Sequence, residues 1–243
     1  MTTADDHFSV PCTSQQRPLW VSLEGPNGVG KTHLATMLTA RLGADCRLLS
    51  ELTDTSDDQV ATQVIGALAA AGDAFLRTGH PLTETFALLA LKVREHELVD
   101  RLPDRPRIVL EDRGVDTVAV YQAAIMTSDP DACFHTDDER DEAAWELAQQ
   151  LHATALPWRP LPDLTLLITD DPETCARRWQ QREGSALIPE QQRRLVDRVV
   201  RLYQRQADHD RGRFRVVARD DRETDEIVDE LHNLVLAAAG GTR

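Results

Sequence analysis

The sequence has little of several features that would identify a class of protein directly. Aromatic residues make up only 5% of its 243 residues, and no apolar run approaches the roughly 20 residues that a membrane-spanning helix needs. Lys and Arg number 27 against 41 Asp and Glu, which gives a formal net charge of −14. A broad nucleic-acid-binding surface needs a basic face, so we expect neither a nucleic acid nor a membrane as partner. An anionic ligand must therefore be held by a local pocket.

Cysteine is scarce as well. The chain has four cysteines, without a CxxC spacing, at Cys12, Cys46, Cys133 and Cys175. This spacing favours reduced thiols over a zinc site or a disulfide framework. Residues 1–17 contain Asp5 and Asp6 and lack the basic start and apolar stretch of a secretory signal, so a cytoplasmic protein is expected.

Short apolar runs alternate with longer helical stretches along the chain. Residues 19–23 form an apolar run before an acidic residue and a glycine, which is typical of a buried strand. Further strands are expected at 47–50, 107–110, 163–169 and 214–217. Helices are expected at 31–42, 59–76, 82–102, 115–126, 139–155, 172–182, 190–207 and 224–239. Such alternation predicts a three-layer α/β/α sandwich with a parallel five-stranded sheet.

The length suits one large α/β domain. We expect this domain over residues 19–243, after an N-terminal extension over residues 1–18. A second domain is not required by the 243 residues of the chain.

The strongest motif directly follows the first expected strand. Residues 25–32, Gly-Pro-Asn-Gly-Val-Gly-Lys-Thr, fit the pattern G-x-x-x-x-G-K-[ST]. The glycines let the backbone curl so that its N–H groups point at phosphate oxygens, and the following helix adds its positive end. Lys31 would reach the β- and γ-phosphates, and the Thr32 hydroxyl would bind Mg²⁺. The motif predicts a P-loop NTPase fold that binds a nucleoside triphosphate through Gly25, Asn27, Gly28, Val29, Gly30, Lys31, Thr32 and His33.

The third expected strand is followed by acidic residues and an arginine, Glu111-Asp112-Arg113-Gly114. Ligands collect at the carboxyl ends of parallel strands. Asp112 could hold Mg²⁺ through water, and Arg113 could bind a phosphate with two hydrogen bonds. The alternative is an acid at the start of a helix beside a surface arginine.

An arginine cluster occupies the helix after the fourth expected strand. Arg178 and Arg182 stand four residues apart and share a helix face with room to converge on one site, and Arg177 lies beside them. Phosphoryl transfer needs positive charge over the γ-phosphate. These residues predict a lid over about residues 177–190, including Gly184-Ser185, although a solvated basic face would have the same sequence.

Three blocks, EGPNGVGKT, EDRGVDTVAVYQ and PDLTLLITDDPETCARRWQQREG, resemble the thymidylate kinases of the nucleoside monophosphate kinase group. The resemblance runs from about Leu19 to Leu236. It implies that Asp112 lies in the metal region, that Arg113 contacts the acceptor monophosphate, and that the lid supplies a catalytic arginine.

The same resemblance implies an acceptor site. The tyrosine and glutamine that lie by the thymine ring in this family correspond to Tyr121 and Gln122, although Tyr121 could equally be a core residue. An arginine that helps to hold the acceptor nucleotide is best matched by Arg94, with Lys92 as a rival.

Two departures from the family concern the acceptor. The family's REPGGT-like loop is replaced by residues 50–55, Ser-Glu-Leu-Thr-Asp-Thr, which contain no arginine. Asn27 stands where an aspartate is common, and an amide cannot carry charge or act as a base. Glu51 could instead bind an acceptor hydroxyl, as a carboxylate does in nucleoside kinases, or be a solvated loop residue.

The sequence therefore predicts an enzyme that uses ATP and Mg²⁺ to phosphorylate a nucleoside monophosphate such as dTMP. Lys31, Arg113, Arg178 and Arg182 are its expected catalytic residues. Two alternatives stay open: a nucleoside or specialised-metabolite kinase with the same donor site, and a regulatory P-loop NTPase. The expected partner is a small nucleotide or nucleoside acceptor, and the expected assembly is a homodimer.

Overall fold

A parallel sheet organises the chain, as the computed structural model shows for residues 17–54, 58–128, 134–184 and 188–241. Its five strands are all parallel, in the order β2-β3-β1-β4-β5. They are β1 (Leu19–Glu24), β2 (Cys46–Leu49), β3 (Ile108–Asp112), β4 (Leu164–Thr169) and β5 (Phe214–Ala218). The expected five-stranded parallel sheet is therefore confirmed.

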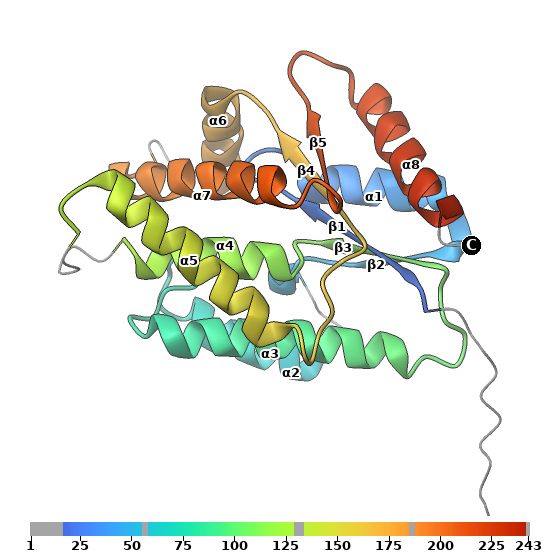
Figure 1. Cartoon of the computed structure of the whole chain (residues 1–243), viewed down its shortest axis with the longest axis horizontal. Coiled ribbons are helices and arrows are strands. Elements are labelled where there is room, and N and C mark those ends of the chain that lie inside the picture. Colours follow the sequence, from blue (N-terminus) through green and yellow to red (C-terminus); the bar gives the residue numbers. More distant parts are fainter. Residues whose placement is uncertain (1–16, 55–57, 129–133, 185–187, 242–243) are drawn as a thin grey trace, which may run out of the picture.

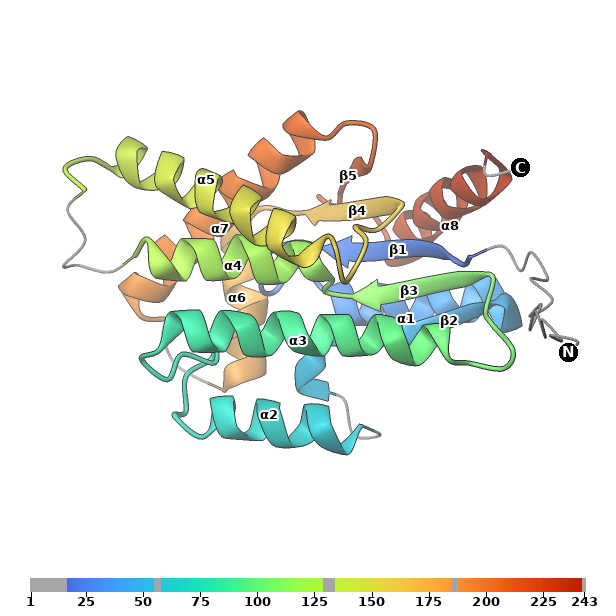
Figure 2. The same cartoon turned by 60° about the horizontal axis from the view of Figure 1, so that its bottom comes forward.

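The described residues form eight α-helices, and most of them lie on the two faces of this sheet. They are α1 (Lys31–Leu42), α2 (Gln59–Ala69), α3 (Pro81–Asp100), α4 (Val115–Met126), α5 (Asp137–Ala155), α6 (Pro172–Glu183), α7 (Glu190–His209) and α8 (Thr224–Gly241). Helices α1 and α8 pack together on one face, and α3, α4, α5 and α7 lie on the other (Figure 1). Figure 2 shows α2 against the outer side of α3. The three layers confirm the expected sandwich.

The side chains of β1 alternate between the two faces of the sheet, with apolar residues on one face and polar residues on the other. Leu19, Val21 and Leu23 pack into the core beneath α1 and α8. Since successive side chains of a strand point to opposite faces, Ser22 and Glu24 face α4 and α7. Both are completely buried, so the strand delivers a carboxylate to the interior of the second layer.

The pairing of β1 with β3 brings the two motifs of the sequence to one edge. Leu23 lies opposite Asp112, so the glycine loop after β1 and the acidic turn after β3 leave the sheet side by side. Strand β1 lies in the middle of the sheet, with β3 and β2 on one side of it and β4 and β5 on the other. The order of the strands along the chain therefore changes direction at β1. Ligands of open α/β sheets bind at such a place.

One expected helix is shorter than the sequence predicted. Helix α2 ends at Ala69 instead of continuing to residue 76. Gly72 has φ of 71°, a conformation outside the helical region, and the Asp73 carboxylate accepts the Phe75 backbone N–H at 2.9 Å. The resulting turn carries the Phe75 ring to within 6.1 Å of the Tyr121 ring.

Some expected features lie outside the described residues. These are residues 1–16 of the expected N-terminal extension, residues 185–187 of the expected lid, Cys12 and Cys133. Within the described part of the chain, no helix is long and apolar enough to cross a membrane.

Helix α5 begins at a capping box that can be tested directly. The Thr136 hydroxyl accepts the Glu139 N–H at 3.1 Å, and the Glu139 carboxylate accepts the Thr136 N–H. Thr136→Ala should lower the free energy of unfolding by about 1 kcal/mol, measured by urea denaturation, because it leaves an N–H of the first turn unpaired. Thr154→Ala, in the last turn of the same helix, is the control and should change it by less than about 0.5 kcal/mol, because its hydroxyl caps no free N–H. Equal losses in both variants would contradict the capping role.

Candidate active site

The glycine loop between β1 and α1 has a backbone that only glycine tolerates at two points. Gly28 has φ of 81°, and a Cβ there would lie 2.0 Å from the Cys175 carbonyl oxygen of α6. Gly30 precedes α1 with φ of 89° and exposes the N-terminus of that helix to the loop. Val29 between them is completely buried, which anchors the loop to the core. The loop therefore has the shape expected of a phosphate cradle.

Lys31 folds back onto this loop. Its ammonium group donates to the carbonyl oxygens of Gly25 and Pro26, both at 2.8 Å. Burial, together with the nearby Arg113 guanidinium, lowers the pKa of Lys31 to about 7. A triphosphate in the loop would supply the negative charge that favours the protonated lysine.

Asp112, the last residue of β3, and Thr32, in the first turn of α1, have side-chain oxygens that could bind a cation. Asp112 is 1% exposed, and neither of its carboxylate oxygens accepts a hydrogen bond from a described residue. Burial raises its pKa, and the charge of Lys31 opposes that rise. Unpaired buried carboxylate oxygens fit a hydrated divalent cation, and the exposed Thr32 hydroxyl is a second oxygen ligand of the kind that Mg²⁺ prefers.

Arg113 is the centre of a second group of polar side chains, next to the loop. It has φ of 66°, and its Nε lies 2.8 Å from the Glu51 carboxylate. Its Nη2 donates to the Asn27 side-chain oxygen at 2.7 Å, and that oxygen also accepts the Tyr121 hydroxyl at 3.1 Å. Burial would raise the pKa of Glu51, but Arg113 and Lys31 outweigh it and hold that pKa below its ordinary value. Glu51 is therefore a carboxylate at neutral pH.

Two cavities meet at these residues. One of about 550 Å³ is lined by Glu51, Arg113, Phe75, Tyr121, Gln122 and further residues of α3 and α4. Another of about 240 Å³ lies over the glycine loop, lined by Gly28, Gly30, Lys31 and the exposed His33 with Arg178. Thr32, Glu51, Arg113 and Arg182 line both. A donor over the loop and an acceptor in the larger cavity would therefore face each other.

The arginines of α6 differ in what they contact. Arg178 lies 2.5 Å from the buried Asp170 carboxylate and lines the smaller cavity, and Arg182 lines both cavities. Arg177 instead donates to the Thr174 hydroxyl at 3.0 Å and lines neither of these two. Arg178 and Arg182, which were expected to share a helix face, thus both line the smaller cavity over the glycine loop.

Of the two basic residues considered on α3, the structure brings Lys92 to the larger cavity and leaves Arg94 outside it. Arg94 pairs with Asp58 at the start of α2, at 2.6 Å. Lys92 lines the cavity, is 2% exposed and contacts Glu95 at 2.8 Å. Residues two apart on a helix point about 200° away from each other, so only one of the two can face the cavity.

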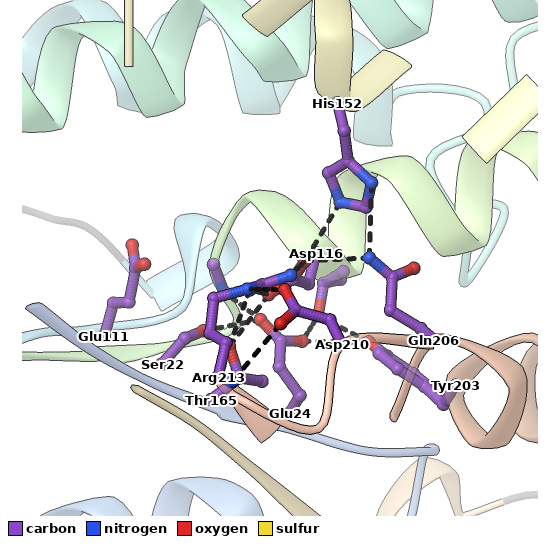
Figure 3. Close-up of polar contacts among 12 residues, drawn as sticks. Ser22, Glu24, Glu111, Asp116, His152, Thr165, Tyr203, Gln206, Asp210 and Arg213 are labelled. Carbon is purple, nitrogen blue, oxygen red and sulfur yellow. Dashed lines mark hydrogen bonds and ion pairs between the residues drawn. The ribbon is translucent and has the colours of Figure 1, made fainter. Parts of the chain in front are cut away.

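A buried polar network behind the loop was not foreseen from the sequence. Figure 3 shows the Glu24 carboxylate among the side chains of Ser22 and Tyr203. Glu24 accepts hydrogen bonds from the Gly114 N–H at 2.7 Å, the Tyr203 hydroxyl at 2.9 Å and the hydroxyls of Ser22 and Thr117. Its bond to Gly114 fixes the turn that holds Arg113. The sequence showed an acid at the end of the strand but not its partner on α7, 179 residues away.

Asp116 forms the second half of the network (Figure 3). The Arg213 guanidinium donates to both of its oxygens, at 2.5 and 3.1 Å, and His152 Nε2 lies 2.9 Å from one of them. Although burial opposes it, Arg213 holds the pKa of Asp116 well below its ordinary value. The first turn of α4, and with it the position of Arg113, is thereby tied to α5 and to the start of β5.

Arg219 is a further residue that sequence reasoning missed. Its Nη1 donates to the Val29 carbonyl oxygen at 2.8 Å, and the same nitrogen would lie 2.3 Å from a Cβ at Gly30. It comes from the segment after β5, where no motif marked it. Its guanidinium therefore packs against the backbone of the glycine loop at Val29 and Gly30.

The parallel sheet, the glycine loop at its switch point and the buried acid opposite define a P-loop nucleotide-binding protein. A family model described as "Thymidylate kinase" matches residues 23–231, so the chain belongs to the thymidylate kinase family. The expected resemblance is confirmed, and with it the class of ATP-dependent nucleotide kinases.

Individual relatives agree with this family. The thymidylate kinase of Ruegeria pomeroyi is 28% identical over 238 residues, which cover 93% of this chain and 98% of the relative. The solved thymidylate kinase of Candida albicans is 15% identical, with a TM-score of 0.61 over 91% of this chain and 92% of that one. That of Ehrlichia chaffeensis is 17% identical, with a TM-score of 0.58 over 91% and 99%. The two structures share the fold.

The buried Glu24 network should dominate the stability of the site. Glu24→Ala removes the acceptor of four hydrogen bonds and leaves the Gly114 N–H buried without a partner. We expect the free energy of unfolding to fall by about 3 kcal/mol in urea denaturation. Glu146→Ala, at an exposed position of α5, is the control and should change it by less than about 0.5 kcal/mol. A similar small change at Glu24 would contradict a structural role for its carboxylate.

Proposed function

We propose that this protein transfers the γ-phosphoryl group of ATP to thymidine monophosphate with the help of Mg²⁺. The observation that carries the proposal is the junction of the two cavities, where Thr32, Glu51, Arg113 and Arg182 line both. The family and the relatives, which are named thymidylate kinases, support this choice of acceptor.

The donor side would bind the phosphates of ATP through the loop. Backbone N–H groups of Gly28 to Lys31 and the N-terminus of α1 supply positive ends of dipoles, and Lys31 would leave its two carbonyl partners to bind the β- and γ-phosphates. Thr32 and Asp112 would hold Mg²⁺, which supplies charge to offset the transferring group. Asp112 is suited to this role because its buried oxygens have no other described partner.

The acceptor side would place the nucleotide in the larger cavity. Arg113 is held there by Glu51 and Asn27 and could bind the acceptor phosphate with two hydrogen bonds. The aromatic rings of Phe75 and Tyr121, 6.1 Å apart, supply apolar surface for a base. Gln122 beside them supplies a polar group.

The lid arginines would act during the transfer itself. The charge on the γ-phosphoryl group shifts as its bond to the donor lengthens, and guanidinium groups aimed at it lower the barrier. Arg182 lines both cavities, so it is the better placed of the two. Arg178, paired with Asp170, would stabilise the donor phosphates.

One observation favours a second candidate. The loop after β2 offers Glu51, a carboxylate at neutral pH, where an acceptor's reacting oxygen would lie, and residues 50–54 contain no arginine. A carboxylate in that place suits the activation of a hydroxyl group. A nucleoside kinase with the same donor site is therefore the alternative that the assay must separate.

Purified protein should form ADP from ATP and Mg²⁺ in proportion to added dTMP. Arg113→Ala should lower kcat/KM for dTMP about a hundredfold, because it removes a charge-assisted contact to the acceptor phosphate. Arg194→Ala, which removes an exposed guanidinium paired with Glu190, is the control and should retain activity. ADP formation with thymidine instead of dTMP would favour the nucleoside kinase. ADP formation without any acceptor would favour a regulatory NTPase.

We also propose a cytoplasmic homodimer. Leu82 and Phe86 stand four residues apart on α3 and are 62% and 56% exposed, so one face of this helix presents apolar side chains to solvent. Phe86→Asp should convert a dimer into a monomer in analytical ultracentrifugation. Glu97→Asp, at an exposed position of the same helix, should leave the dimer intact. A monomeric wild-type protein would overturn the proposal.

A further inference from the structure

Two buried polar side chains meet in the wall of the acceptor cavity. Thr85 of α3 is completely buried, and Gln122 of α4 is 2% exposed and lines the cavity. The Thr85 hydroxyl lies 2.6 Å from the Pro81 carbonyl oxygen and 3.1 Å from Oε1 of the Gln122 side-chain amide. Neither the family resemblance nor the motifs of the sequence point to Thr85.

The proton of the Thr85 hydroxyl decides how this amide is turned. A hydroxyl has one proton, and the carbonyl oxygen of Pro81 can only accept it. A separation of 2.6 Å is that of an O–H···O hydrogen bond, so the proton lies toward Pro81. Gln122 Oε1 then has no Thr85 proton to accept, and the contact becomes a hydrogen bond only if the amide turns over so that its NH₂ group faces Thr85. The oxygen and nitrogen of a glutamine amide are told apart by this kind of argument.

In the turned-over orientation, Gln122 donates from its NH₂ group to Thr85 and has its carbonyl oxygen left for the cavity. Thr85 offers a lone pair to the amide because its own proton is directed along the helix to Pro81, four residues back. The residue that fixes the amide therefore lies on α3, and the residue that would touch a ligand lies on α4.

We propose that Thr85 is a positioning residue for base recognition, acting through Gln122; this rests on the proposed function. A thymine joined to its sugar at N1 has one N–H group, at N3, and a fixed carbonyl oxygen is complementary to it. Cytosine has an unprotonated N3 in the same place, so two acceptors would face each other. The site thus selects 4-oxopyrimidine nucleotides and rejects 4-aminopyrimidine nucleotides.

The inference is tested by the ratio of kcat/KM for dTMP to kcat/KM for dCMP. In Thr85→Val the amide loses its acceptor and can turn either face to the cavity, so the ratio should fall about ten- to a hundredfold. Thr85→Ser keeps the hydroxyl and should restore the wild-type ratio. An equal loss of activity toward both nucleotides in Thr85→Val would indicate a structural role only and would overturn the proposal, as would an unchanged ratio.

Thr127, directly after α4, provides a matched control. Its hydroxyl is also buried and donates to the carbonyl oxygen four residues back, that of Ala123 at 2.8 Å. It does not line the acceptor cavity. Thr127→Val should therefore leave the ratio unchanged, and a comparable fall would show that loss of any buried threonine hydroxyl in this layer alters selectivity.

A second measurement needs no variant and no activity. In the ligand-free wild-type protein, NMR should show nuclear Overhauser effects between the side-chain NH₂ protons of Gln122 and the methyl group of Thr85. Their absence, with those protons instead exposed to the cavity and contacting added thymidine, would overturn the amide orientation. If the protein does not phosphorylate dTMP, the proposed function fails, and this measurement still decides the orientation independently.

Discussion

The buried carboxylate of Glu24 is the group on which the arrangement of the site depends. It ends the central strand one residue before the glycine loop, and it accepts hydrogen bonds from the Gly114 N–H and from Tyr203 on α7. Burial and the nearby Asp116 charge raise the pKa of Glu24, while the hydrogen bonds from Ser22, Thr117 and the Gly114 N–H oppose that rise. The same hydrogen bonds fix the turn after β3, so Arg113 keeps its position relative to the loop.

The basic residues of the site, like Glu24, are paired with groups of opposite charge or with hydrogen-bond partners. A chain with a net charge of −14 must bind polyanionic nucleotides, and it concentrates Lys31, Arg113, Arg178 and Arg182 around two connected cavities. Lys31 contacts carbonyl oxygens of the loop, and Arg113 and Arg178 contact the Glu51 and Asp170 carboxylates. Replacement of these contacts by phosphate oxygens is the exchange that binding requires.

The acceptor side differs from its family's sequence pattern at Asn27 and in the loop after β2. The contacts around Asn27 show what this residue does in the structure. Asn27 cannot carry a charge, but its side-chain oxygen accepts from both Arg113 and Tyr121 and so aligns the two residues. The aromatic wall includes Phe75, which reaches the cavity because α2 ends early and Asp73 shapes the following turn. Selectivity for a base would then depend on Gln122 and on the hydroxyl that orients its amide.

The sequence by itself determined the features that depend on short-range spacing. The glycine loop, helix α4 at residues 115–126 and the parallel sheet were predicted because motif spacing and the alternation of apolar runs are local properties. Sequence could not choose between Lys92 and Arg94, because alignment within a helix can slip while the two side chains point in opposite directions. It also could not find the partners of Glu24 or the contact of Thr85 with Gln122. Those contacts join residues far apart in the chain, and only the packing of α3, α4 and α7 onto the sheet brings them within hydrogen-bonding distance.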